Sequence, residues 1–285
     1  MSRQITGFLN TIKFEHTIFA LPFGYLSMVL AAGGRPSWRQ FIWITVAMAA
    51  ARTAAIAANR LIDHQIDARN PRTANRSLPQ GLISPAIVTL VIIISTAVLL
   101  IAARQLNPLA LVLSPFALFL LIGCSFTKRF TWLSHFILGL ADGMAPAGAW
   151  VAVRGRLDPQ ALLLWFATAV WIAGFDLLYA CRDVEFDRAE GLCAAPARFG
   201  ISTALRQAQI CHALTILSLA VLGLWLGLGA IYWLGWLVVV ALLFYERSLA
   251  RPDAPSKVTL ILFTVKSPIS IVTLFATLPA PLVPR

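Results

Sequence analysis

The sequence predicts an all-α integral membrane protein, a single domain built as a bundle of about nine transmembrane helices. Hydrophobic residues make up 59% of the 285 residues and charged residues only 12%, about half the share usual in soluble domains. The mean hydropathy is +0.79. Apolar stretches of roughly 20 residues, the length that crosses a bilayer, follow one another along the chain.

We expect the spans near residues 17–34, 40–60, 84–103, 107–125, 132–153, 160–181, 207–227, 229–245 and 258–282. The first is an anchor that stays in the membrane, because residues 1–14 are polar and amphipathic and show no signal-peptide cleavage site. The fourth contains Pro108 and Pro115, and a Gly-containing hinge at 223–232 separates the seventh from the eighth. Gly and Pro are tolerated inside membrane helices, so neither feature argues against spanning.

Basic residues divide the loops into two groups. With the N-terminus inside, the inner segments hold 14 of the 23 Lys and Arg residues and the outer segments hold 6, which is the positive-inside bias. The two longest loops, 68–83 and 182–206, both lie on the inner side. We therefore expect a multi-pass protein of the plasma membrane (the inner membrane of a Gram-negative cell), with its N-terminus and its active-site loops facing the cytoplasm.

The net charge of +11 is explained by this topology, and a polyanionic substrate would add to it. No soluble basic domain is present, so we expect no nucleic-acid partner, and no obligatory protein partner is evident. The four cysteines show neither CxxC nor a zinc-binding spacing, and we interpret them as small apolar residues. A disulfide between Cys181 and Cys193 is not expected, although spacing alone leaves it open.

Two acidic motifs end the second and sixth spans. Each has the form Asp-x-x-x-Asp, at Asp63 and Asp67 and again at Asp183 and Asp187. Positions four apart share one face of a helix, so each motif points two carboxylates the same way, and Asn59 and Tyr179 extend these faces by one turn. The motifs lie 120 residues apart, or four spans, which hints at a repeat of spans one to four in spans five to eight.

Paired carboxylates beside a membrane are costly unless something neutralises them. Magnesium does so, since it binds oxygen ligands, typically one or two carboxylates together with water and substrate phosphate. Two such helix ends facing each other would hold two Mg²⁺ ions with a diphosphate bridging them. The alternative is that these are solvated carboxylates balanced by nearby arginines at positions 60, 69, 182 and 188.

Basic and buried ionisable residues allow two interpretations. Arg60, Arg72, Arg76, Lys128 and Arg182 either reflect topology or bind diphosphate oxygens, a use that suits both residue types. Four further ionisable residues lie inside predicted spans: Arg52, Asp142, Asp176 and Lys266. Arg52 could bind the carboxylate of an acceptor, with Asp142 and Asp176 orienting that acceptor or taking its proton. Tyr179 is a further candidate for binding the acceptor. Alternatively, Arg52 and the two aspartates pair with one another for structural reasons.

These residues carry a family resemblance. Asn59-Arg-x-x-Asp63-x-x-x-Asp67, with Asn-Pro-Arg-Thr-Ala-Asn-Arg at 70–76, resembles the first signature of the UbiA superfamily of intramembrane prenyltransferases. Tyr179-x-x-x-Asp183-x-x-x-Asp187 resembles its second signature. The similarity runs over most of the chain and is greatest to the 4-hydroxybenzoate polyprenyltransferase branch. The run 174–187 also resembles relatives assigned to menaquinone synthesis, which prenylate a dihydroxynaphthoate.

The resemblance implies a nine-helix bundle around a central cavity that opens laterally to lipid. It implies two Mg²⁺ ions as cofactors, held by Asn59, Asp63 and Asp67 on one side and by Asp183 and Asp187 on the other. It also implies that Lys128 contacts the diphosphate. The substrates would be a polyprenyl diphosphate and a small aromatic acceptor, joined in quinone biosynthesis by ionisation of the diphosphate and electrophilic attack on the ring.

Two other functions fit part of the sequence. A cation-coupled secondary transporter could use the carboxylates as an ion path, but transporters place such groups near the membrane midplane, whereas these lie at helix ends. A phosphatidyl alcohol transferase would carry a denser aspartate motif in one short segment. The 9 Trp, 17 Phe and 4 Tyr could stabilise an allyl cation by cation–π contact, although ordinary membrane packing explains most of them.

Overall fold

The computed structural model describes residues 14–249 and 267–278, with side chains described from residue 21 onward. In this part of the chain there are helices and no strands. Those of the first half are α2 (Phe14–Ala31), α3 (Trp38–Ile62), α4 (His64–Arg69), α5 (Pro85–Leu106), α6 (Pro108–Thr127) and α7 (Ser134–Asp142). Those of the second half are α8 (Ala145–Arg154), α9 (Pro159–Ala180), α10 (Val184–Ala189), α11 (Ala195–Phe199), α12 (Ile201–Leu226), α13 (Ala230–Leu249) and α15 (Ser267–Thr277).

The predicted membrane spans are confirmed in their order. In the described residues, seven helical segments are long and apolar enough to cross a bilayer, if α7 and α8 are taken together as Ser134–Arg154. Two shorter apolar helices, Leu21–Ala31 and Pro268–Thr277, coincide with parts of the first and ninth predicted spans. The beginning of the ninth span, including Lys266, lies outside the described residues. The protein is therefore a multi-pass membrane protein.

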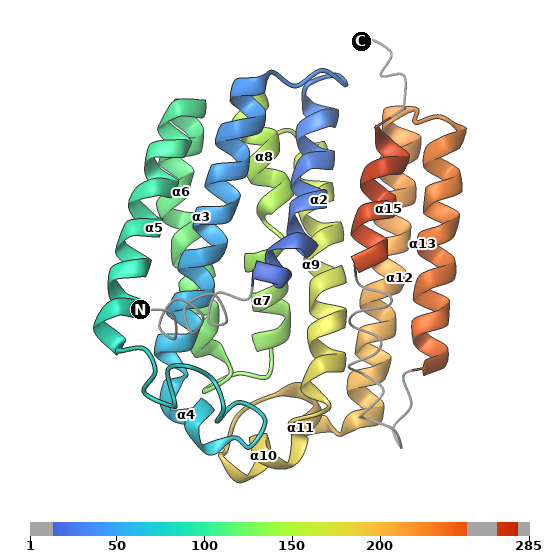
Figure 1. Ribbon diagram of the computed structural model, residues 1–285. Coiled ribbons are helices and arrows are strands. Elements are labelled where there is room, and N and C mark those ends of the chain that lie inside the picture. Colours follow the sequence, from blue (N-terminus) through green and yellow to red (C-terminus); the bar gives the residue numbers. More distant parts are fainter. Residues whose placement is uncertain (1–13, 250–266, 279–285) are drawn as a thin grey trace.

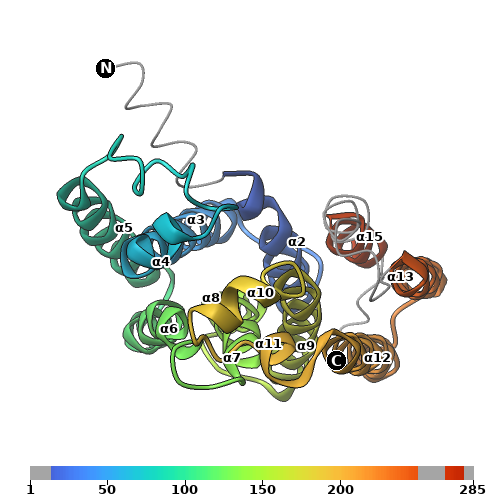
Figure 2. The ribbon, with the colours of Figure 1, turned by 90° about the horizontal axis from the view of Figure 1, so that it is seen from below.

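The long helices run side by side, and the short helices α4, α10 and α11 gather at one end, which we call the loop end (Figure 1). Seen from the loop end, α2, α3, α6, α7, α8 and α9 surround the centre, while α12, α13 and α15 stand to one side (Figure 2). α9 is the most buried span and packs against α7 on one side and α12 on the other. α9 therefore lies between two groups of helices, with α7 against one of its faces and α12 against the other.

Small residues let the helices approach closely. Ala50 and Ala54 of α3 pack with Leu99 of α5 and Leu118 of α6. Such contacts replace the hydrophobic effect as the driving force for helix association in lipid. Polar ties supplement them: the hydroxyl of Ser27 in α2 donates a hydrogen bond to the carbonyl of Pro146 in α8, 2.6 Å away.

The fifth predicted span, 132–153, is broken in the structure. α7 ends at Asp142 and α8 begins at Ala145, with Gly143 and Met144 between them. Pro146 follows the break and has no N–H to donate to the carbonyl four residues earlier, so a continuous helix is disfavoured. Gly143 also lies so close to α9 that a Cβ there would stand 2.6 Å from the backbone nitrogen of Ala169. The break places Asp142 at a helix end in the bundle interior.

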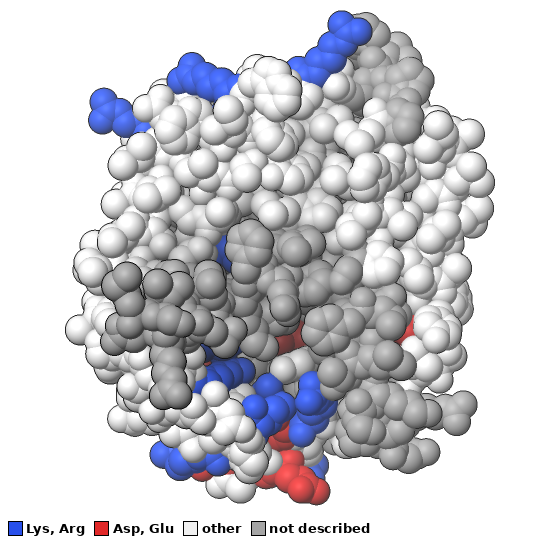
Figure 3. Space-filling model, in the orientation of Figure 1, with Lys and Arg blue, Asp and Glu red and all other residues white. Residues whose placement is uncertain are grey.

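On the face shown in Figure 3, most charged side chains of the described residues lie at the two ends of the bundle, and few lie in the belt between them. Lys and Arg occur at both ends, whereas Asp and Glu concentrate at the loop end beside further basic residues. An uncharged belt matches the hydrocarbon region of a bilayer. The mixed charges at the loop end mark the part of the molecule where polar chemistry is concentrated.

Candidate active site

Both acidic motifs lie where a helix breaks, which the sequence interpretation of continuous helices did not anticipate. α3 ends at Ile62 and α4 starts at His64, so Asp63 alone links them. α9 ends at Ala180 and α10 starts at Val184, so Asp183 is the last of three linking residues. In each motif the two aspartates nevertheless remain joined by a backbone hydrogen bond between positions four residues apart. The amide of Asp67 donates to the carbonyl of Asp63 at 2.7 Å, and that of Asp187 donates to Asp183 at 2.7 Å.

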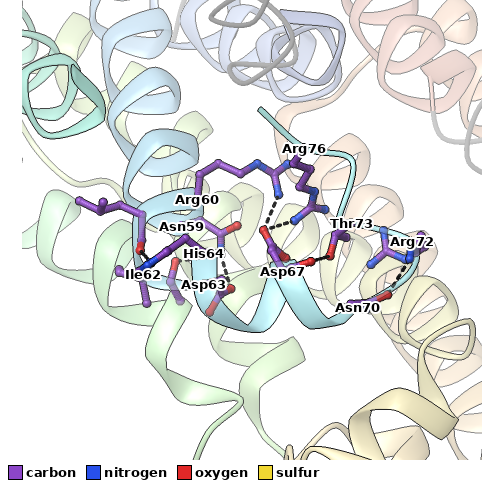
Figure 4. Close-up of polar contacts among 12 residues, drawn as sticks. Asn59, Arg60, Ile62, Asp63, His64, Asp67, Asn70, Arg72, Thr73 and Arg76 are labelled. Atoms are coloured by element: carbon purple, nitrogen blue, oxygen red, sulfur yellow. Dashed lines mark hydrogen bonds and ion pairs between the residues drawn. The ribbon is translucent and has the colours of Figure 1, made fainter. Parts of the chain in front are cut away.

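In the first motif, buried carboxylates are held by cations. Asp63, which is 3% exposed, accepts from Asn59 at 3.1 Å and lies 3.2 Å from the Lys128 ammonium and 2.9 Å from the Arg129 guanidinium. Asp67, which is 6% exposed, accepts a hydrogen bond from Arg76 and forms a longer ion pair with Arg60. Figure 4 shows Arg60 and Arg76 converging on one of its oxygens, at 3.8 and 2.5 Å. Charges this deeply buried are tolerable only when paired.

The second motif faces the first through Arg72, which follows α4. Its guanidinium donates two hydrogen bonds to Asp183, from Nε to Oδ1 at 2.8 Å and from Nη2 to Oδ2 at 2.6 Å. Nη1 donates to the hydroxyl of Tyr179 at 2.7 Å. Tyr179 also contacts Arg182, whose guanidinium lies 5.3 Å from the ring centroid. The predicted acceptor contact Tyr179 thus lies among the basic residues predicted to bind diphosphate.

Asp187 differs from the other three aspartates, because its carboxylate has no hydrogen-bond or ion-pair partner among the described residues. Burial and the neighbouring charge of Asp183 raise the pKa of Asp187 to about 6. Loss of hydration and a nearby like charge both disfavour the ionised form of a carboxyl group. Asp187 is therefore the acidic group at this site that most lacks a cation.

Every predicted site residue lines one cavity of about 520 Å³ that opens at the loop end. The metal-ligand and diphosphate-binding candidates lie toward the opening. They are Asn59, Arg60, Asp63, Asp67, Arg72, Arg76, Lys128, Arg182, Asp183 and Asp187. The cavity also includes Arg52, Asp142, Asp176 and Tyr179, the residues predicted to contact the acceptor. Segments far apart in the sequence therefore contribute to one site.

Arg52 and Asp142 form an ion pair at 2.6 Å, as the structural interpretation of these residues expected. Nε of Arg52 is buried and has no partner among the described residues, so one donor of this guanidinium remains available. Asp142 and Asp176 do not pair with each other. Asp176 instead meets His135, whose Nδ1 lies 2.6 Å from its Oδ2.

A second cavity, of about 250 Å³, adjoins the first and is lined mainly by apolar residues. The two cavities share Arg52, Leu121 and Asp142, so the apolar space begins where the ion pair stands. The polar cavity leads to the loop end, and the apolar cavity extends among α3, α5, α6 and α8. Together they could hold a molecule with one charged and one apolar end.

The residues of the polar cavity fit magnesium. They supply carboxylate and amide oxygens, which are the ligands that this ion prefers. Within the described residues, no three Asp, Glu, His or Cys side chains form a ready cluster around one point, so each motif offers its own pair. Magnesium usually keeps substrate phosphate and water among its ligands, and the unpartnered carboxylate of Asp187 is the group that a cation would neutralise.

Sequence reasoning missed three residues that contact the predicted ones: Ser125, Arg129 and His135. Ser125 accepts from Asn59 at 3.2 Å, and Arg129 pairs with Asp63. The only sequence signal for Arg129 is its position next to Lys128, which the positive-inside bias of the inner loops also explains. For His135 no spacing pointed to Asp176, because the pairing arises between two different helices. All four cysteines are free, as expected.

The chain resembles known proteins over most of its length. Residues 20–267 match the model of the UbiA prenyltransferase family. The chain is 32% identical over 228 residues to the 4-hydroxybenzoate octaprenyltransferase of Aliivibrio salmonicida, covering 79% of each protein. It is 33% identical over 238 residues to the enzyme of that name from Pseudoalteromonas translucida, covering 81% of this chain and 78% of the relative.

Solved structures have the same fold. The apo structure of a UbiA homologue from Aeropyrum pernix superposes with a TM-score of 0.84 at 29% identity, covering 92% of this chain and 96% of the homologue. A UbiA homologue from Archaeoglobus fulgidus, solved with GPP and Mg²⁺, gives a TM-score of 0.75 at 18% identity, covering 95% and 99%. Motifs, fold and relatives agree. This chain belongs to the UbiA prenyltransferase family and is a membrane-embedded prenyltransferase.

Proposed function

We propose that this enzyme transfers a polyprenyl group from a polyprenyl diphosphate to the ring of a 4-hydroxybenzoate-like acceptor in quinone biosynthesis. One observation carries the proposal: two acidic motifs and a set of basic side chains converge on one cavity that continues into an apolar one. The names of the curated relatives support the acceptor, and the homologue solved with GPP and Mg²⁺ supports the donor and the metal.

Magnesium would be held by Asn59, Asp63 and Asp67 from the first motif and by Asp183 and Asp187 from the second, most simply as two ions. When bound, it supplies Lewis-acid stabilisation of the negative charge on the departing diphosphate. These residues contribute oxygen ligands from opposite sides of one cavity, so a diphosphate between them would be reached from both sides. Asp187 brings the carboxylate that has no other partner.

Basic side chains would bind the diphosphate itself. In the structure the aspartates pair with four of these side chains, Arg60, Arg72, Arg76 and Lys128. The guanidinium of Arg182 lies over the ring of Tyr179. Guanidinium groups match phosphate geometry with two parallel donors, and lysine acts as a point charge. With the aspartates serving as magnesium ligands, these cations would be available to the phosphate oxygens. They then stabilise the charge that develops as the allylic C–O bond breaks.

The acceptor would lie at the inner end of the polar cavity. The unpartnered Nε of Arg52 would bind its carboxylate, while Asp142 pairs with Nη1 of the same guanidinium. Apolar side chains of Leu138, Ile172 and Phe175 line the same cavity and would keep water from the allyl cation. The prenyl chain of the donor would occupy the adjoining apolar cavity.

The orientation follows from charge. Most Lys and Arg residues lie in segments assigned to the inner side, and the loop end carries the two acidic motifs. We therefore propose that the loop end faces the cytoplasm, so that the diphosphate enters from the cytoplasmic interface while the prenyl chain remains in the apolar region. The plasma membrane is the location that this topology favours.

The direct test is incubation of the purified protein with Mg²⁺, geranyl diphosphate and 4-hydroxybenzoate, with the product detected by mass spectrometry. A prenylated acid that disappears when a chelator is added supports the proposal. Binding of the donor without product would contradict the assigned acceptor and point to a dihydroxynaphthoate, which is tested under the same conditions. If neither substrate binds and no diphosphate is released, the proposed reaction is wrong.

A further inference from the structure

His135 and Asp176 form a pair that the diphosphate chemistry does not use. His135 begins α7 and is 5% exposed, whereas Asp176 lies in α9 and its side chain is 29% exposed toward the cavity. Nδ1 of His135 lies 2.6 Å from Oδ2 of Asp176, a short hydrogen bond typical of a charged acceptor. Both residues line the polar cavity, so the pair borders the proposed acceptor space.

The other nitrogen of His135 determines what the imidazole can do. The backbone amide of Ala195 donates to Nε2 of His135 at 3.2 Å. A backbone N–H has no alternative but to donate, so Nε2 must accept and the ring is neutral with its hydrogen on Nδ1. Nδ1–H therefore donates to Asp176. The network fixes both the tautomer and the ring plane, and it directs the Nδ1–H of His135 at the Asp176 carboxyl group.

Ala195 ties this pair to the loop that carries the second acidic motif. It is the first residue of α11 and ends the loop that follows α10, and the amide of Cys193, two residues earlier, donates to the carbonyl of Lys128 at 2.8 Å. The segment 191–195 thus contacts both the residue proposed to bind diphosphate and the imidazole that holds Asp176. Placement of this loop over the cavity sets the geometry of Asp176.

We propose that Asp176 accepts the proton lost by the acceptor ring and that His135 is the residue that positions it. This inference rests on the proposed function. The allylic C–O bond breaks first, and its electron pair leaves on the diphosphate; the ring carbon then forms a bond to the resulting allyl cation. The ring C–H bond then breaks, its electron pair restores aromaticity, and the proton binds to the Asp176 carboxylate. Asp176 passes this proton to the diphosphate product, which carries it away and leaves the carboxylate ready for the next turnover.

Asp176 suits this role better than Asp142. Asp142 would have to give up its ion pair with Arg52 in order to take a proton, which would release the guanidinium that holds the acceptor. Asp176 can take a proton on one oxygen while the neutral His135 continues to donate to the other. A general base must be held in place while its charge changes, and this arrangement provides that.

The chain offers a matched control in a second buried His–carboxylate pair. His212 of α12 and Glu246 of α13 lie 3.0 Å apart, with side chains 6% and 3% exposed, and neither lines the described cavities. His212 lies on the far side of α9, against Gly174, whereas Asp176 faces the cavity. Loss of the His212 imidazole therefore tests stability alone.

The experiment compares wild-type protein, His135→Phe and His135→Asn, with His212→Asn as the control. Turnover is measured with geranyl diphosphate and with 4-hydroxybenzoate that carries hydrogen or deuterium beside the hydroxyl group. We expect His135→Phe to lower kcat by about 100-fold, the usual size of a general-base contribution. The KM for the donor should not change, and the deuterium isotope effect should exceed that of the wild type.

His135→Asn retains an N–H near the position of Nδ1, and we expect it to restore much of kcat and to lower the isotope effect again. His212→Asn should lower the melting temperature with no change in isotope effect. A His135→Phe enzyme that keeps wild-type kcat, or that loses activity with an unchanged isotope effect, overturns the inference. Wild-type protein that forms no product with either aromatic acceptor overturns the proposed function itself.

Discussion

Arg72 and Asp183 are 111 residues apart in the sequence and meet through two parallel hydrogen bonds of 2.8 and 2.6 Å. This contact joins the segment after the first acidic motif to the start of the second. It does so at the opening of the cavity, where the proposed diphosphate would bind. The guanidinium thus holds the two halves of the site together before substrate arrives and is positioned to bind phosphate afterwards.

Replacing Arg72 with Lys should weaken donor binding, because an ammonium group cannot make two parallel bonds to a carboxylate or a phosphate. We expect kcat/KM for the donor to fall by about 10- to 100-fold, the loss that accompanies a charge-assisted hydrogen bond. Steady-state kinetics at varied geranyl diphosphate measures this change.

Arg69 provides the control for Arg72. It also joins the two loops, through a 2.6 Å contact with Glu190, but its side chain is 56% exposed and does not line the cavity. Exposed ion pairs contribute little to stability, so Arg69→Lys should change kcat/KM less than about two-fold. Equal losses in the two variants would show that Arg72 acts only by joining the loops.

Asp187→Asn should lower magnesium-dependent turnover by about 100-fold or more and leave the protein folded.

Burial and Asp183 raise the pKa of Asp187 to about 6, so the ionised carboxylate opposes folding at higher pH. In magnesium-free buffer at about pH 8, the melting temperature of the Asp187→Asn variant should equal or exceed that of the wild type. The difference should vanish below about pH 4, where Asp187 is protonated in both the folded and the unfolded wild-type protein. Calorimetry without and with Mg²⁺ measures both effects, and full activity in the variant would contradict the metal assignment.

Arg52→Ala should reduce kcat/KM for a carboxylate-bearing acceptor by about 10- to 100-fold, because the free donor Nε is lost. The effect on the donor should be much smaller. An acceptor without the carboxylate, such as a simple phenol, should react equally well with the variant and the wild type. If the variant loses donor and acceptor use to the same degree, the Arg52–Asp142 pair is structural.

Gly139→Ala should destabilise the fold, because a Cβ at this position would overlap the backbone carbonyl of Ala169 in α9. Overpacking of this kind costs about 1–3 kcal/mol. Gly123→Ala in α6 is the matched control, since a Cβ there meets nothing within 4 Å. We expect a lower melting temperature for Gly139→Ala in detergent, and an unchanged or slightly higher one for Gly123→Ala. The reverse order would show that α7 and α9 do not pack as described.

The sequence by itself determined the membrane architecture, the order of the spans and many of the residues that line the site. These are local properties: hydropathy over about 20 residues sets a span, and a four-residue spacing sets a helix face. All of the predicted site residues consequently line one cavity. The metal and substrate roles of those residues remain predictions.

Only the tertiary structure decided which charges pair and where the helices break. Asp63 meets Arg129, and His135 meets Asp176, across different helices, and no spacing within one segment encodes such contacts. The close approach of Gly143 to Ala169 at the break between α7 and α8 likewise exists only in the folded bundle. Hydropathy acts over neighbouring residues, whereas pairing of buried charges depends on positions in space. That pairing is set only when the whole bundle closes around the cavity.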